Sequence, residues 1–208
     1  LTGKKLYLGN SLDERIDGIR PGQVASILAA PSVGKTALSL NIARNQQYLG
    51  DKSITKDGLL IMFHLETSRW ELYERIIQME TKTPTYLIEK KIQSEDKAFI
   101  EQARQSIQKY KNVVHVVHRI AARELKAYIL AIQEVYESTV NGIMIDYGQL
   151  MRSDKPNEYA RMTDTMQTQK EVAMDLEIPV INFSQVNRAD NKEGKISMTS
   201  GKGSGEIE

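Results

Sequence analysis

Short runs of apolar residues alternate along the chain with longer segments in which apolar residues recur every three or four positions. Five apolar runs predict strands, at 24–29, 59–65, 113–117, 143–146 and 180–183. Helical spacing predicts helices after Gly34, from Arg69, after Ser94, around 125–132 and over 158–176. Strands and helices that alternate in this way are typical of βαβ units. The pattern therefore predicts an α/β fold with a mostly parallel twisted sheet and helices on both faces.

The first predicted strand leads into a loop with the spacing of a phosphate-binding P-loop. Residues 29–36 read Ala-Ala-Pro-Ser-Val-Gly-Lys-Thr, with Ala29 where the motif usually has its first glycine. Backbone N–H groups of such a loop and of the following helix start point at phosphates. Lys35 would reach the β- and γ-phosphates of ATP, and the Thr36 hydroxyl would bind Mg²⁺. The residues predicted to bind the nucleotide are Ala30, Pro31, Ser32, Val33, Gly34, Lys35, Thr36 and Ala37.

Two acidic residues follow predicted strands and suit the remaining chemistry. Asp146 ends the run Ile143-Met144-Ile145, where a P-loop ATPase needs a second carboxylate for Mg²⁺. Glu66 follows the run 59–65, where a carboxylate can polarise the attacking water. The alternatives are a solvated turn aspartate and a glutamate that only favours the start of the next helix.

Other polar residues near strand ends have more than one interpretation. Gln185, after the run 180–183, could sense the γ-phosphate through a hydrogen bond, or be a loop amide without a ligand. His64 could face the same side of its strand as Glu66, which makes a metal pair conceivable. No third ligand is indicated, so an interpretation as structural histidines is favoured for His64, His115 and His118.

Composition limits the other classes of protein. The 28 Lys and Arg nearly balance the 27 Asp and Glu, so a nucleic-acid contact would depend on local charge. The chain has no cysteine, which excludes disulfides and fits a reducing compartment. No apolar run approaches the ~20 residues of a membrane span. A start at Leu1 and an end at Glu208 predict one excised domain, 1–208, with material missing at both ends.

The motifs and their order resemble the C-terminal RecA-like ATPase domain of DnaB-type replicative DNA helicases. The resemblance runs from about Gly18 to Glu208. It is carried by residues 30–37 and 40–43, by Leu65-Glu66-Thr67-Ser68, by 145–151, by 178–181 and 184–188, and by 204–208. RecA-type recombinases share the P-loop but lack this combination, so the resemblance favours a helicase. The departure at Ala29 is compatible with a divergent, phage-encoded member.

The resemblance implies an ATP-driven motor that translocates on single-stranded DNA and unwinds duplex. It implies a ring-shaped hexamer with ATP sites between subunits, a primase and a helicase loader as partners, and the cytoplasm of a bacterium or phage-infected cell. The family completes each site with an arginine finger from a late β-hairpin, which this chain does not contain. Loops after the Asp146 and Gln185 strands would face DNA. The residues expected to contact it are Arg188, Lys192, Lys195 and Lys202.

Three alternatives remain open at this stage. The chain could be a RecA-like ATPase of recombination, repair or a clock-type switch. It could also be a nucleotide-binding helicase relative that acts as a loader or scaffold, although Glu66 argues against an inactive ATPase. The segment 187–208 could be an ordinary surface loop, because its basic residues are matched by Asp190, Glu193, Glu206 and Glu208.

Overall fold

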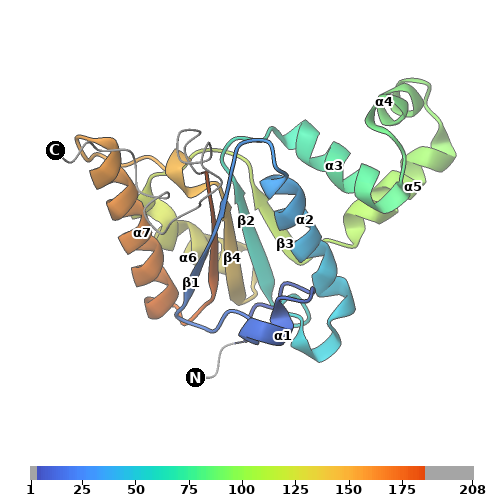
Figure 1. Ribbon diagram of the computed structural model, residues 1–208. Helices are drawn as coiled ribbons and strands as arrows, with labels where there is room; N and C mark the ends of the chain where they lie inside the picture. Colours follow the sequence, from blue (N-terminus) through green and yellow to red (C-terminus); the bar gives the residue numbers. More distant parts are fainter. Residues whose placement is uncertain (1–3, 186–208) are drawn as a thin grey trace.

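A computed structural model describes residues 4–185 and contains one five-stranded sheet (Figure 1). Every strand pairs in parallel with its neighbours. From edge to edge the strands are β1 (Val24–Ala29), β5 (Val180–Gln185), β4 (Val140–Asp146), β2 (Leu59–His64) and β3 (Val113–Val116). Because all strands run the same way, their carboxyl ends lie along one edge of the sheet, where ligands bind in open α/β folds.

Helices connect the strands and cover both faces of the sheet (Figure 1). The α-helices of the described residues are α1 (Asp13–Ile16), α2 (Lys35–Asn45), α3 (Arg69–Thr81), α4 (Thr85–Gln93), α5 (Lys97–Gln108), α6 (Leu125–Tyr136) and α7 (Glu158–Asp175). Short 3-10 turns lie at η1 (Gln46–Tyr48), η2 (Gly50–Lys52), η3 (Ala122–Glu124) and η4 (Gly148–Leu150). In the described part of the chain, no helix is long and apolar enough to cross a membrane.

Strand β2 shows how the sequence buries both faces of the sheet. Its odd positions, Leu59, Ile61 and Phe63, pack against residues of α6 and α7. Its even positions, Leu60 and Met62, pack against residues of α2 and α3. Successive side chains of a strand point to opposite faces, so a strand covered on both sides needs apolar residues at every position. The continuous apolar run is thus explained, and the predicted fold class is confirmed by the parallel sheet.

Helices α3, α4 and α5 extend away from the sheet and share a small core of their own (Figure 1). The predicted capping box at the start of α3 is present, with Ser68 and Glu71 exchanging hydrogen bonds. The sequence pattern does not predict helix α4. This helix has nine residues, and only Ile88 among them is buried, so its apolar periodicity is too short to distinguish it from a loop.

Two strands are longer than their apolar runs. Strand β4 begins at Val140 rather than Ile143, and Gly142 lies inside it rather than before it. A Cβ atom at Gly142 would meet Ile54 Cδ1 at 3.0 Å, so this glycine marks a close approach inside the sheet. Strand β5 continues past Phe183 to Gln185, because its ladder with β1 ends at the pair of Ala29 and Gln185. Gln185 is therefore the last residue of the strand and not a loop residue.

A buried carboxylate joins α2, α3 and α5 on one side of the sheet. The Glu80 side chain is 1% exposed and accepts hydrogen bonds from Arg44 Nε at 2.9 Å, Lys109 Nζ at 2.5 Å and Tyr110 OH at 3.0 Å. Burial alone would raise the pKa of Glu80. The donors from Lys109, Tyr110 and Arg44 outweigh it and hold this pKa below its usual value. The ionised form of Glu80 therefore stabilises the fold.

Replacing Glu80 by Gln should lower the free energy of unfolding by about 2 kcal/mol at pH 7, since charged hydrogen bonds contribute most of such a cluster. Because the pKa of Glu80 is lowered on folding, its contribution is present above the unfolded pKa and is lost as pH falls through the folded pKa. Urea unfolding should show the difference shrinking towards acid pH. The exposed Glu101→Gln serves as the control and should change stability by less than about 0.5 kcal/mol. A pH-independent difference would contradict this assignment.

Candidate functional site

The loop between β1 and α2 has the backbone of a phosphate cradle. Ser32 and Gly34 adopt positive φ angles of 62° and 97°, which turn the chain sharply before α2 begins at Lys35. No side chain of the described residues caps this helix start. Its first N–H groups have no partner within the helix, and together with the helix dipole they favour an anion at this end. The loop can therefore bind phosphate through its main chain.

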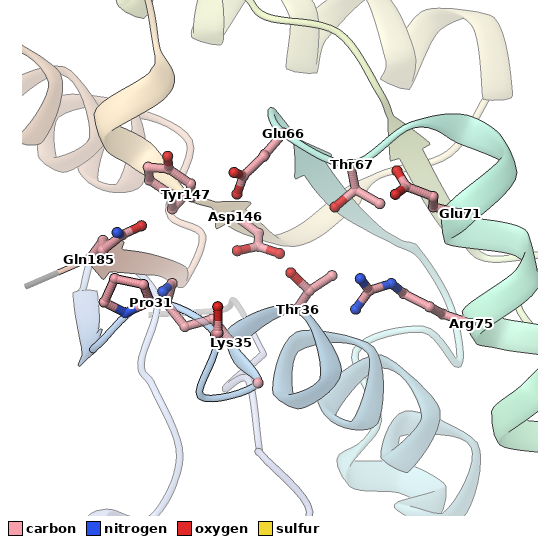
Figure 2. A pocket seen from close by; sticks show the side chains of 12 residues that line it. Pro31, Lys35, Thr36, Glu66, Thr67, Glu71, Arg75, Asp146, Tyr147 and Gln185 are labelled. Carbon is pink, nitrogen blue, oxygen red and sulfur yellow. The ribbon is translucent and has the colours of Figure 1, made fainter.

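A cavity of about 620 Å³ opens next to this loop, at the carboxyl edge of the sheet (Figure 2). The side chains predicted from four different segments lie around it. The residues that line it are Pro31, Ser32, Gly34, Lys35, Thr36, Glu66, Thr67, Glu71, Arg75, Asp146, Tyr147 and Gln185. The fold thus brings together residues that are far apart in the sequence, from Pro31 to Gln185. The volume lies in the ordinary range for small-molecule sites.

Lys35 makes its hydrogen bond within the loop itself. Its Nζ donates to the carbonyl oxygen of Ala30 at 3.1 Å and lies 5.9 Å from the centre of the Tyr147 ring. A single neutral acceptor satisfies only part of an ammonium group, which has three donors. The lysine can therefore exchange this contact for phosphate oxygens without leaving the loop.

Asp146 ends β4 and is only 5% exposed. Burial raises the pKa of this carboxyl group, while the Thr36 hydroxyl and the Lys35 charge act in the opposite direction. No Lys or Arg of the described residues forms an ion pair with it. A buried carboxylate beside a hydroxyl, without a protein cation of its own, suits a hard divalent cation such as Mg²⁺. The pair Asp146 and Thr36 therefore fits the predicted metal ligands.

Glu66 lies two residues beyond the end of β2, and its carboxylate faces the cavity opposite Thr36 (Figure 2). It is exposed to solvent, so water can reach it. The charge of Glu66 contributes to the raised pKa of Asp146, which is consistent with two carboxylates at one site. Gln185 enters the cavity from the end of β5 on the far side of the loop (Figure 2). Both residues therefore reach the cavity, while their roles in hydrolysis stay predictions.

Four residues line the cavity that the sequence analysis did not select: Thr67, Glu71, Arg75 and Tyr147. Glu71 is engaged in the cap of α3. Arg75 points from α3 towards Thr36 (Figure 2) and forms no ion pair with an acidic residue of the described part. A spacing of four places Arg75 on the same helix face as Glu71, and this is the one signal in the sequence that could have indicated it.

The remaining predicted residues are not part of the cavity wall. Val33 is 62% exposed, and neither Ala30 nor Ala37 lines the cavity with its side chain. Any contact they make with a nucleotide would come from the main chain, so their assignment stays a prediction. The four residues predicted to contact DNA lie outside the described residues; they are Arg188, Lys192, Lys195 and Lys202.

The histidines form contacts with other side chains. His64 Nε2 and His115 Nδ1 are 3.0 Å apart, and the two residues lie on the paired strands β2 and β3. Burial lowers the pKa of His64 to about 3 and that of His115 to about 4, so both are neutral near pH 7. His118 bonds to the Tyr128 hydroxyl at 2.6 Å. Across residues 4–185, no three acidic or histidine side chains gather as a metal site, and the structural interpretation of these histidines is favoured.

The loop, the lysine and the buried aspartate at the end of a parallel strand define a P-loop NTPase of the RecA-like class. The sequence profile described as "DnaB-like helicase C terminal domain" matches residues 9–208. The chain therefore belongs to the family of DnaB-like helicase C-terminal domains, as the resemblance of its motifs predicted.

Curated relatives agree with this assignment. The chain is 30% identical over 187 residues to the replicative DNA helicase DnaB of Leifsonia xyli subsp. xyli, covering 85% of this chain and 38% of that protein. It is 28% identical over 194 residues to DnaB of Geobacillus stearothermophilus, covering 91% of this chain and 41% of the relative. The chain thus spans about two fifths of the length of these relatives.

The same fold is found in two solved structures. One is the ATPase domain of a DnaB-like helicase, which superposes with a TM-score of 0.74 at 20% identity, covering 96% of this chain and 71% of that chain. The other is a DnaB-like replicative helicase, solved in a study of its interactions with primase. It gives a TM-score of 0.76 at 19% identity, covering 96% of this chain and 48% of that chain. At this level of identity the structures support the fold, while the family rests on the sequence.

Proposed function

We propose that this chain is the ATP-driven motor domain of a replicative DNA helicase. It hydrolyses ATP, translocates on single-stranded DNA and unwinds duplex. The observation that carries the proposal is the convergence of five side chains on one cavity at the carboxyl edge of the sheet (Figure 2): Lys35, Thr36, Asp146, Glu66 and Gln185. Membership of the DnaB-like family supports DNA unwinding as the use of that ATPase.

The first step is the binding of the triphosphate. Main-chain N–H groups from Ser32 to Thr36 hold the phosphate oxygens, and Lys35 places its ammonium group on the β- and γ-phosphates. Thr36 and Asp146 hold Mg²⁺, which neutralises the negative charge of the phosphates when it is bound. The raised pKa of Asp146 supports this assignment, since a carboxylate made costly by burial gains most from a cation.

The second step is the attack of water on the γ-phosphate. Glu66 accepts a proton from the water, for which its exposed position at the cavity rim is suited. Gln185 donates a hydrogen bond to the γ-phosphate and so distinguishes ATP from ADP. Gln185 is the last residue of β5, and the residues predicted to contact DNA follow it in the sequence. Loss of the γ-phosphate would therefore be communicated directly to that segment.

Arg75 is a further cation for this site. Its guanidinium points into the cavity from α3, opposite the loop that holds Lys35 (Figure 2). Replacing Arg75 by Ala should lower kcat/KM for ATP about tenfold, because one charged hydrogen bond contributes about 1.5–3 kcal/mol. Steady-state ATPase assays measure this. Arg104→Ala, on the exposed face of α5, is the matched control and should be silent. Equal kinetics for the two variants would remove Arg75 from the site.

Partners of the whole protein belong to the same proposal. A motor of this family would act as a ring hexamer on single-stranded DNA in the cytoplasm, with a primase and a helicase loader. One of the structurally similar helicases was solved with its interactions with primase in view, which supports the primase. The loop 152–157 after β4 and the basic residues 188, 192, 195 and 202 would contact the DNA backbone.

Unwinding of a forked DNA duplex by the full-length protein tests the proposal. ATP and Mg²⁺ together should release the labelled strand, and single-stranded DNA should stimulate ATP turnover. A recombination ATPase would coat the strand without displacing its partner. A loader or scaffold would bind nucleotide with no turnover. Either of these results would overturn the helicase proposal, while the nucleotide site itself would stand in both cases.

A further inference from the structure

Gln149 makes two hydrogen bonds to the backbone of Gln185, the residue proposed to sense the γ-phosphate. Its Nε2 donates to the Gln185 carbonyl oxygen at 2.8 Å, and its Oε1 accepts from the Gln185 N–H at 2.8 Å. Gln149 lies on the turn η4, three residues after Asp146. One side-chain amide thus occupies both polar groups of one main-chain residue, in the manner of a neighbouring strand.

The sheet itself does not provide this support. Strand β5 lies between β1 and β4, and its register with β1 continues to Gln185. Its register with β4 ends two residues earlier, at the pair of Asp146 and Phe183. On the β4 side, Gln185 has therefore passed the end of the ladder. The Gln149 amide takes the place of the missing strand there and keeps β5 extended up to the cavity.

The turn η4 is fixed against β5 by close packing. A Cβ atom at Gly148 would lie 2.2 Å from Asn182 Oδ1 and 3.0 Å from Gln169 Nε2. Both of these side chains are fully or almost fully buried. Only a glycine allows the turn to come this close to the strand. The position of Gln149 opposite Gln185 is thus set by packing and not by its own side chain.

We propose that Gln149 is a positioning residue that fixes Gln185 for the γ-phosphate and links it to the Asp146 loop. The inference rests on the proposed function, because it requires Gln185 to contact the nucleotide. The two hydrogen bonds determine where the Gln185 side chain leaves the sheet. A small displacement of such a group from its productive position is enough to slow a reaction substantially. The same link would relate the metal carboxylate to the end of β5.

Replacing Gln149 by Met tests the inference, since Met has a similar length and neither of the two hydrogen bonds. In the full-length protein, kcat for ATP should fall about tenfold. KM should change little, because the loop and Lys35 are untouched. The preference for a non-hydrolysable ATP analogue over ADP should shrink towards unity, a change that a purely structural role would not produce. Gln149→Ala should give the same pattern, and the exposed Gln105→Ala on α5 should give none.

A double-mutant cycle with Gln185→Ala separates the inference from the proposed function. If Gln149 acts through Gln185, Gln149→Met should have almost no further effect on kcat once Gln185 is Ala. Independent, multiplying effects, or a Gln149→Met protein with normal kcat and normal ATP preference, would overturn the inference and leave the helicase proposal intact. If Gln185→Ala itself leaves kcat and ATP preference unchanged, the proposed role of Gln185 fails, and the inference fails with it.

Discussion

Replacing Lys35 by Met is expected to lower kcat/KM for ATP about 10²–10³-fold, the largest effect of any single change in the site. The ammonium group lies at the base of the cavity, near the Ala30 carbonyl and the Tyr147 ring. Its charge would act on the phosphates in the ground state and, more strongly, as charge develops on the leaving oxygen. Met keeps most of the apolar length of the side chain and removes the charge. Steady-state ATPase kinetics measure the loss.

The control for this change is Lys97→Met, at the exposed start of α5 and outside the cavity. It alters net charge by the same amount, so any general electrostatic effect on ATP encounter would appear in both variants. The account requires a loss with Lys35→Met alone. A Lys35→Met protein that hydrolyses ATP at the normal rate would mean that the phosphates bind somewhere else.

Replacing Glu66 by Gln is expected to lower kcat about 10²-fold, the lower range for a general base, and to leave nucleotide binding nearly unchanged. Gln has the shape of Glu but cannot accept the proton of the attacking water. Because Glu66 is exposed and is not paired in an ion pair of the described part, its loss should not destabilise the fold. Single-turnover hydrolysis and equilibrium binding of ATP separate the two effects.

Glu134→Gln, on the exposed side of α6, is the matched control for Glu66→Gln and should turn over ATP normally. Equal loss of binding and turnover in Glu66→Gln would indicate that Glu66 holds the nucleotide or its metal, and not the water. Unchanged turnover would place the base elsewhere in the cavity, with Glu71 an unsuitable candidate because its carboxylate caps α3.

The parts of the structure that follow from local rules were predictable from the sequence. The run from Leu59 to His64 needs apolar residues at almost every position, because both of its faces are covered. The P-loop is a contiguous motif, and Asp146 and Glu66 each directly follow an apolar run. Parallel strands then bring these separate segments to one edge. The fold class and the main candidate residues therefore required no knowledge of tertiary contacts.

The remaining features depend on contacts between distant elements. Arg75 is one exposed residue of a helix, and only the placement of α3 beside the P-loop directs it into the cavity. Gln149 has no local feature that marks it, since its partner is 36 residues away. Helix α4 buries only Ile88 and so lacks a long apolar period. The extension of β5 to Gln185 comes from its pairing with β1.

Binding of ATP in the presence and absence of Mg²⁺ tests the central claim most directly. Calorimetric titration of the folded protein with a non-hydrolysable ATP analogue should show binding with Mg²⁺, weaker binding with EDTA, and a large loss in Asp146→Asn, because this carboxylate and Thr36 would hold the cation. Folded protein that does not bind the analogue, or that binds equally well with EDTA, would contradict the account.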